Sequence, residues 1–451
     1  EPAKRAEIYK VIDSVSYEAS KVAIPNEYDK LMSAIGSQGT NAGTSNDFTV
    51  YMEDVPSNQL ENWAIIQSER FADATIRLFH TELETVYEEK NMSLTNDGRK
   101  ASEALYALLY ANHPYGQQTT LGEAEHLKNP SIINIKNFFD TYYVPNNMAV
   151  ILSGDFNPDE AIKIVDAHFG KLERKEVPEF TFEPEKPIEE PLVAEVIGLE
   201  AERVSVGFRF PGAASREAMM ADMVGMMLSN RSTGLIDLNV NLQQKTLSSG
   251  AYVSKLSDYS MLNLYGMNKG GQTLEEVKDI LLEQVDLLKK GNFPDWMIDA
   301  TINNLKLNEM RRLESNSGRA WTMSSSFINE IDWKDVVSYI DELGKITKDE
   351  LIAFANEHLN TNYAVVYKRQ GTPEAELVEK PSITPIHINR DVESEYLKSF
   401  KERKVAEIEP AFLDFEKDLN KLTTTTNLEI LHKENVENKT FSLYYYYPFG
   451  T

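Results

Sequence analysis

The sequence contains no cysteine, which excludes disulfide bonds and thiolate metal sites. Basic residues are scarce: 46 lysines and arginines stand against 71 aspartates and glutamates, for a formal net charge of −25 at pH 7. Nucleic acids and anionic membrane surfaces are bound through basic patches, so this balance argues against both as partners. No apolar run is long enough to cross a bilayer, and we expect no transmembrane segment.

The chain is long enough to build more than one hydrophobic core. Its 451 residues suggest at least two domains. Capping sequences mark three helix starts. Asn157–Glu160 has an N-cap asparagine followed by proline, and Thr273–Glu276 and Thr347–Glu350 have the pattern of capping boxes.

Strand and helix patterns alternate along the chain. Period-2 alternation predicts strands at 48–52 and 204–210, and apolar runs predict strands at 148–156 and 261–270. Apolar residues at helical spacing predict amphipathic helices at 101–110, 132–139, 217–228, 274–288, 296–312 and 348–359. This mixture is typical of an α+β fold, in which helices cover one face of largely antiparallel sheets.

A weak internal repeat indicates a duplicated domain. Residues 137–155 and 353–371 both read as a helix end, a short turn with asparagine, and a strand containing Ala-Val. The repeat predicts two tandem homologous domains, although helix–turn–strand units also recur by chance. The predicted organisation is a first domain at 1–180, a second at 190–370, a linker at 371–426, and the start of a third, truncated domain at 427–451.

Both ends suggest a piece of a longer protein. Residue 1 is glutamate instead of methionine, and the last residues are KTFSLYYYYPFGT. Phe441, Leu443, Tyr445 and Tyr447 alternate with their neighbours, which predicts an aromatic strand with nothing after it to cover it. We therefore expect further residues to complete this strand.

The stretch TELETVYEEKN places four glutamates within eight residues of a predicted helix. At about 100° per residue, Glu82 and Glu89 fall roughly 20° apart, on the side that carries Val86. Glu84 and Glu88 point the opposite way. The pattern predicts two carboxylates inside the stripe that a helix normally buries.

Two interpretations fit this helix. The first is an acidic surface helix, because runs of charge are normally solvated. The second is a metal site. Burying Glu82 and Glu89 without partners would cost on the order of several kcal/mol, and a bound cation removes that penalty.

Several motifs stand in a fixed order around this helix. Asn41, Ala42, Thr44, Ser45, Thr49 and Tyr51 fit the pattern NA-x-TS-x-x-x-T-x-Y, with Gly43 where an aromatic residue is common. Glu82, Val86 and Glu89 fit E-x-x-x-V-x-x-E, and HPYG, YYVPNNMAVILSGDF and AHFGKL follow. In these motifs and their order the chain resembles the insulinase–pitrilysin (M16) family of zinc metallopeptidases over essentially its whole length.

The resemblance implies a zinc endopeptidase that hydrolyses peptides or unfolded segments by metal-activated water. The family holds its zinc with two histidines of an H-x-x-E-H helix and one downstream glutamate, which corresponds to Glu89. Glu82 corresponds to a second glutamate that supports the catalytic site. Asn41, Ala42 and Thr44 are the implied substrate-binding residues, on a strand that accepts an extended peptide. The resemblance also favours a cell-envelope or periplasmic location.

The chain departs from the family at one point, because it contains no H-x-x-E-H. The segment GEAEH, at 122–126, has glycine where the first ligand belongs and stands at the wrong place in the order. We therefore expect the zinc site to be incomplete. Three hypotheses remain: a peptidase whose motif lies upstream of Glu1, a noncatalytic peptide-binding or scaffold member that lost the motif, and a half that works with the remaining half or a partner subunit.

Overall fold

The computed structural model describes residues 2–123, 126–127, 131–373, 383–386, 389, 391–409 and 411–450. They divide into two compact units, Glu1–Arg403 and Lys404–Thr451. Within the described residues, no helix combines the length and apolar character needed to cross a membrane. The division into domains at 1–180 and 190–370 stays a prediction, and we keep the names first and second domain for those ranges.

The first domain is mostly helical and contains one two-stranded antiparallel sheet, β1–β2. Thr44 of β1 pairs with Thr49 of β2 next to the connecting turn. The elements in chain order are α1 (Pro2–Ser20), α2 (Glu27–Ala34), β1 (Gln38–Thr44), β2 (Thr49–Asp54), the 3₁₀ turn η1 (Ser57–Gln59), α3 (Leu60–Ala72), α4 (Phe79–Thr95), α5 (Asp97–Leu109), α6 (Pro114–Gln117), α8 (Ile132–Tyr142), the 3₁₀ turn η2 (Pro145–Asn147) and α9 (Pro158–Phe169).

The second domain is built on a five-stranded sheet with the order β3-β7-β4-β6-β5. Only the β3–β7 pair is parallel, so the sheet is largely antiparallel, as predicted. Its elements are β3 (Leu192–Gly198), β4 (Arg203–Pro211), α10 (Arg216–Leu228), the π-helical turn η3 (Asp237–Asn241), β5 (Ser248–Lys255), β6 (Tyr259–Met267), α11 (Leu274–Lys289), α12 (Trp296–Leu313), α13 (Asn316–Ile328), α14 (Trp333–Leu343), α15 (Lys348–His358) and β7 (Tyr363–Gln370).

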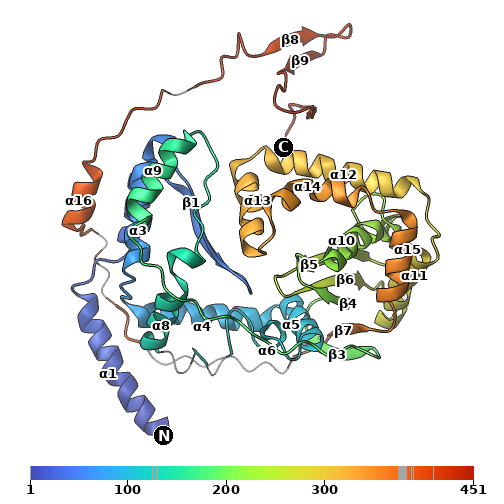
Figure 1. Ribbon diagram of the computed structural model, residues 1–451, viewed down its shortest axis with the longest axis horizontal. Coiled ribbons are helices and arrows are strands. Elements are labelled where there is room, and N and C mark those ends of the chain that lie inside the picture. Colours follow the sequence, from blue (N-terminus) through green and yellow to red (C-terminus); the bar gives the residue numbers. More distant parts are fainter. Residues whose placement is uncertain are drawn as a thin grey trace. The chain divides into compact units, whose positions relative to one another are not determined.

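The sheet of the second domain is covered on both faces. α10 and α11 pack on one face, where Phe208 and Leu264 of the sheet belong to the main hydrophobic core (Figure 1). α5 of the first domain lies against the other face, where its Leu105 and Leu109 pack with Val366 of β7. The first domain therefore contributes a helix to the core of the second.

Local sequence signals are confirmed where they concern helices. The Thr273 and Thr347 side chains accept from the N–H groups of Glu276 and Glu350, and each glutamate accepts from the N–H of its threonine, so both capping boxes form. Asn157 accepts from the N–H groups of Asp159 and Glu160 at the start of α9. These bonds satisfy backbone donors that a helix start leaves free.

Two predicted strands do not form. Residues 148–156 and 441–447 contain no strand and belong to no sheet among the described residues, and 154–156 form a bend. The unit Lys404–Thr451 instead contains a hairpin of β8 (Asn420–Thr423) and β9 (Glu429–His432). An apolar alternating sequence becomes a strand only when a partner strand is available to it.

The predicted linker contains a helix, α16 (Glu395–Lys401). Its Leu397 and Phe400 are buried against Met32 of α2 and Ile66 of α3. A short amphipathic segment inside a charged stretch was therefore missed, because its stability comes from packing on the first domain.

A buried ion pair joins the first domain to the second. Asp97, the first residue of α5, is 2% exposed, and its Oδ2 lies 3.0 Å from the Nζ of Lys368 on β7, which is 3% exposed. Asp97 also accepts from the backbone N–H of Glu200 at 2.7 Å and pairs with Lys100 at 3.0 Å. Gly198 makes this approach possible, since a Cβ there would lie 2.0 Å from Asp97 Oδ1.

These contacts set the protonation of Asp97. Burial alone would raise its pKa, but the hydrogen bond from Glu200 and the two ammonium groups outweigh burial and lower the pKa to about 2. The carboxylate is therefore charged at neutral pH. Lys368 gains further partners by donating to the carbonyls of Gly198 and Ala201 at 3.3 Å.

Asp97→Asn should lower the free energy of unfolding at pH 7 by about 3–5 kcal/mol, because it leaves the buried Lys368 charge without its partner. The folded pKa of about 2 lies below the unfolded value of about 3.9, so this stabilisation is complete above that value and is lost as the pH falls toward 2. Urea unfolding at pH 7, 4 and 2.5 measures the change. The difference between wild type and variant should shrink in acid.

Asp140→Asn is the matched control, since Asp140 is an exposed carboxylate of α8. It should leave the unfolding free energy within about 0.5 kcal/mol of wild type. Equal stability of Asp97→Asn and Asp140→Asn at pH 7 would contradict a stabilising role for the buried pair.

Candidate functional site

A chamber of about 2850 Å³ lies inside the Glu1–Arg403 unit. Its walls include β2 and residues 148–156 from the first domain, the segment 177–181 at the end of that domain, and α13 with the loop after it from the second domain. Small-molecule pockets have volumes of roughly 300–1,000 Å³. The chamber is therefore large enough for a polypeptide segment.

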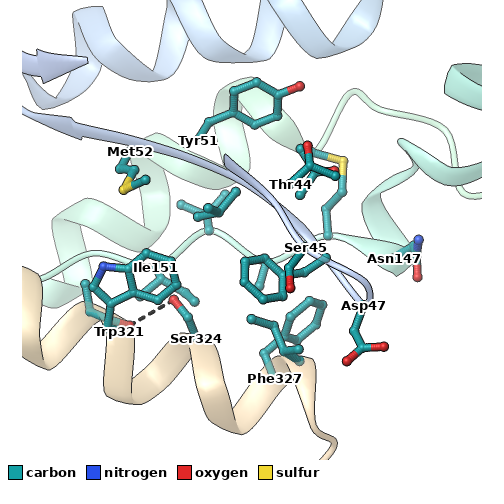
Figure 2. A pocket seen from close by; sticks show the side chains of 18 of the residues that line it. Thr44, Ser45, Asp47, Tyr51, Met52, Asn147, Ile151, Trp321, Ser324 and Phe327 are labelled. Carbon is teal, nitrogen blue, oxygen red and sulfur yellow. Dashed lines mark hydrogen bonds between the residues drawn. The ribbon is translucent and has the colours of Figure 1, made fainter. Parts of the chain in front are cut away.

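The β1–β2 hairpin and α13 face each other across the chamber. Figure 2 shows Met52 on the side of the hairpin that faces Trp321 of α13, with Tyr51 on the opposite side. Phe48 and Trp321 meet edge to face, with ring centroids 6.2 Å apart. Apolar and aromatic side chains thus alternate with open backbone along these walls.

Residues 148–156 line the chamber without a strand partner among the described residues. Every residue of this segment is half-buried or exposed. Extended backbone with unpaired hydrogen-bonding groups is the surface to which a peptide adds as a further strand. This arrangement suits binding of an unfolded polypeptide through its main chain.

The three substrate-binding residues expected from the sequence lie on β1, and one of them lines the chamber. Thr44 lines the chamber, whereas Asn41 and Ala42 are exposed on the same strand and are not part of its wall. The side-chain oxygen of Asn41 accepts from the backbone N–H of Ala42 at 2.9 Å. Their role in substrate binding stays a prediction.

The tip of the hairpin is fixed by a carboxylate. Asp47 accepts hydrogen bonds from the hydroxyl of Tyr115 and, at 3.0 Å, from the backbone N–H of Ser257 in the second domain. Burial raises the pKa of Tyr115, and the hydrogen bond to Asp47 raises it further, so the phenol keeps its proton and donates it. His113 Nε2 lies 3.2 Å from Asp258 Oδ2 beside this contact.

The expectation that Glu82 and Glu89 belong to the buried face of their helix is wrong. Both are exposed on α4, and the buried residues are Leu83, Tyr87, Lys90 and Ser93. The stripe of Leu83, Tyr87 and Lys90 lies about 100° around the helix from the two glutamates. It is held by Tyr87, which donates to the carbonyl of Leu127 at 2.7 Å, and by Lys90, which donates to that of Gly122 at 2.7 Å.

The residues present do not fit a zinc ion by themselves. Catalytic zinc takes three protein ligands. Glu82 and Glu89 are seven residues apart, about 10 Å along the helix axis, so they cannot both bind one ion. Across the described ranges no three or more His, Asp or Glu residues lie together in a group able to hold a metal. We therefore assign no catalytic step to this chain.

Several residues of the chamber were not singled out from the sequence. Asp47 follows a Gly-rich stretch, and Trp321 lies in α13, a helix that the periodicity analysis did not predict. Tyr115 was noted only as part of HPYG. A local signal existed for Tyr115, but its partner Asp47 is 68 residues away and no pattern connects them.

The fold and the motifs can be compared with known proteins. Residues 133–305 match the family described as the peptidase M16 inactive domain. The zinc protease PqqE of Helicobacter pylori (strain ATCC 700392 / 26695) is 22% identical over 357 residues, which cover 77% of this chain and 80% of that protein.

Solved structures show the same fold. The structure of a protease from Helicobacter pylori matches with a TM-score of 0.71 at 21% identity, over 78% of this chain and 88% of that chain. The periplasmic protease PqqL from Escherichia coli matches with a TM-score of 0.63 at 16% identity, over 92% of this chain and 49% of that chain. The chain thus spans about half the length of PqqL.

The chain is therefore similar to zinc proteases in sequence and fold, and its residues 133–305 match the M16 peptidase family.

Proposed function

We propose that this chain is the peptide-binding half of a zinc endopeptidase, and that it binds unfolded polypeptide in the chamber by strand addition. The observation that carries the proposal is the segment 148–156, which lines the chamber and pairs with no strand among the described residues. Main-chain hydrogen bonds give affinity with little demand on the substrate side chains, which would lie against wall residues such as Met52 and Trp321.

The zinc site would be completed by residues that this chain does not contain. Glu89 is the proposed ligand and Glu82 the proposed supporting group, since both correspond to the family positions and both are accessible on α4. The two histidines would come from an H-x-x-E-H segment upstream of Glu1 or from a partner subunit. The metal, once held, supplies Lewis-acid activation of water.

A second function is favoured by the family match itself. Residues 133–305 match a family described as inactive, and the chain has no H-x-x-E-H. A noncatalytic member would use the same chamber to hold peptides or to support a complex. Peptide binding is common to both functions, and zinc binding in the parent protein separates them. A periplasmic or envelope location is proposed from the likeness to PqqL, which is described as periplasmic.

Strand addition predicts the effect of proline in the unpaired segment. Successive N–H groups of an extended chain point to opposite sides, so either Val150→Pro or Ile151→Pro removes a donor that faces the chamber. One of the two should weaken binding of a fluorescein-labelled, unstructured peptide about tenfold in anisotropy titrations. Neither substitution should remove a hydrogen bond between strands of the protein, so the melting temperature should stay at the wild-type value.

Val150→Ala and Ile151→Ala are the controls, because they shorten the side chain and keep the N–H. They should bind the peptide within about twofold of wild type. If neither proline variant binds more weakly than its alanine counterpart, the main chain of this segment is not the peptide-binding element.

The zinc proposal predicts that Glu89→Gln in the parent protein abolishes stoichiometric zinc, because a neutral amide replaces an anionic ligand. Glu82→Gln should weaken zinc affinity roughly 10- to 100-fold, as expected for a supporting group. Metal analysis of the purified proteins and competition with a zinc chelator measure both.

Glu88→Gln is the matched control, since Glu88 is the exposed neighbour of Glu89 on the same helix. It should keep the wild-type zinc content. Zinc at wild-type level in Glu89→Gln would remove the peptidase proposal and leave the noncatalytic function.

A further inference from the structure

The charged side chains of the chamber wall are almost all of one sign. The first domain contributes the carboxylates of Asp47, Glu53, Asp54, Asp155 and Glu179. The second domain contributes Asp258, Glu330 and Asp332. No lysine or arginine is among the described residues that line the chamber, where His113 and His126 are the basic side chains.

These carboxylates lack cationic partners from within the chain. Among the described residues, the one ion-pair contact to this set joins Asp258 to His113. Glu53 accepts from neutral donors, the hydroxyl of Tyr28 at 2.9 Å and the amide of Gln67 at 3.0 Å. Asp47 likewise accepts from the hydroxyl of Tyr115 and a backbone N–H.

The arginines that touch the wall are engaged elsewhere. Arg70 lies over the ring of Tyr51 at 4.1 Å and donates to the hydroxyl of Tyr28 at 3.0 Å. Arg319 donates to Ser153 at 3.0 Å and to the carbonyl of Leu313 at 2.6 Å. Neither side chain is part of the chamber lining.

A buried acceptor stands unused beside Glu53. Gln67 is 2% exposed and lines the chamber, and its side-chain oxygen has no hydrogen-bond donor among the described residues. An ammonium or guanidinium group supplies donors and cancels carboxylate charge at the same time.

A concave wall of like charges focuses the electrostatic potential into the space that it encloses. The net charge of −25 adds to this field and does not oppose it. The half-buried ring of Trp321 and the exposed ring of Phe327 line the chamber and also suit cations, which are attracted to aromatic rings. A glutamate- or aspartate-rich peptide would meet repulsion on every side of the chamber.

From this arrangement we infer that the chamber selects cationic polypeptides, unfolded segments rich in lysine and arginine. The inference rests on the proposed peptide-binding function and names its substrate class. It assigns to the chamber carboxylates a role in substrate choice that is separate from main-chain recognition. Cationic segments enter and stay, whereas acidic segments of the same length and apolar content are excluded.

The test uses two unstructured, fluorescein-labelled peptides of equal length that differ only in having lysine where the other has glutamate. Anisotropy titrations with the whole chain at about 50 mM salt should show at least roughly tenfold tighter binding of the lysine peptide. The difference should shrink at about 500 mM salt, because added ions screen charges. A neutral glutamine version should bind with intermediate affinity.

The outcomes separate the two proposals. If none of the three peptides binds, the peptide-binding function itself fails. If all three bind equally well at low salt, the function stands and charge selection is overturned. Tighter binding of the glutamate peptide would overturn it as well.

The double substitution of Glu330→Gln and Asp332→Asn tests whether the chamber is the source of the effect. Both residues are exposed at the loop between α13 and α14. Loss of these two charges should weaken binding of the lysine peptide about threefold and leave binding of the glutamine peptide unchanged. Glu283→Gln with Asp286→Asn on α11 removes the same charge away from the chamber and should change neither. Equal weakening by both doubles would assign the preference to net charge and overturn selection by the chamber.

Discussion

The geometry of the Glu1–Arg403 unit depends on the buried pair between Asp97 and Lys368. The pair fixes the start of α5 against β7, and the rest of α5 then packs along the sheet of the second domain. α5 leads into the HPYG turn, whose Tyr115 holds Asp47 at the tip of the β1–β2 hairpin. One desolvated contact thus helps set the position of β2 relative to α13, and through it the width of the chamber. A buried pair of this kind adds little net stability but is costly to break, which suits a fixed arrangement.

The sequence predicted well what is decided within a few residues. Both capping boxes formed because threonine and glutamate three positions apart satisfy each other's backbone donors. The methionines of α10 recur at helical spacing, and Met220, Met223 and Met227 are buried in the main core, as expected of a packed helix. The order of motifs, which needs no geometry, indicated the M16 family, which residues 133–305 match.

What could not be predicted depends on partners distant in the chain. The face of α4 was misassigned because Leu83, Tyr87 and Lys90 find partners near residues 122–127, and those contacts outweigh the pattern of glutamates. The run 148–156 has strand composition, yet strand formation needs a neighbour that the described residues do not supply. Asp97 and Lys368 are 271 residues apart, and neither looks unusual within its own segment. The chamber, which such contacts create, was for the same reason invisible in the sequence beyond the motif residues of β1 and β2.

One local hydrogen bond on β1 affects the tendency of the protein to aggregate in solution. Asn41 occupies the donor of Ala42 with its own side chain, so that position offers nothing to an approaching chain. Open strand edges invite copies of the same molecule to stack on one another. Because Asn41 pairs this one N–H group, the regular row of intermolecular hydrogen bonds that a growing fibre would need is interrupted at Ala42. The neighbouring chamber wall can still bind a peptide. The protein can therefore keep unpaired backbone groups in the chamber wall and still resist aggregation at high protein concentration.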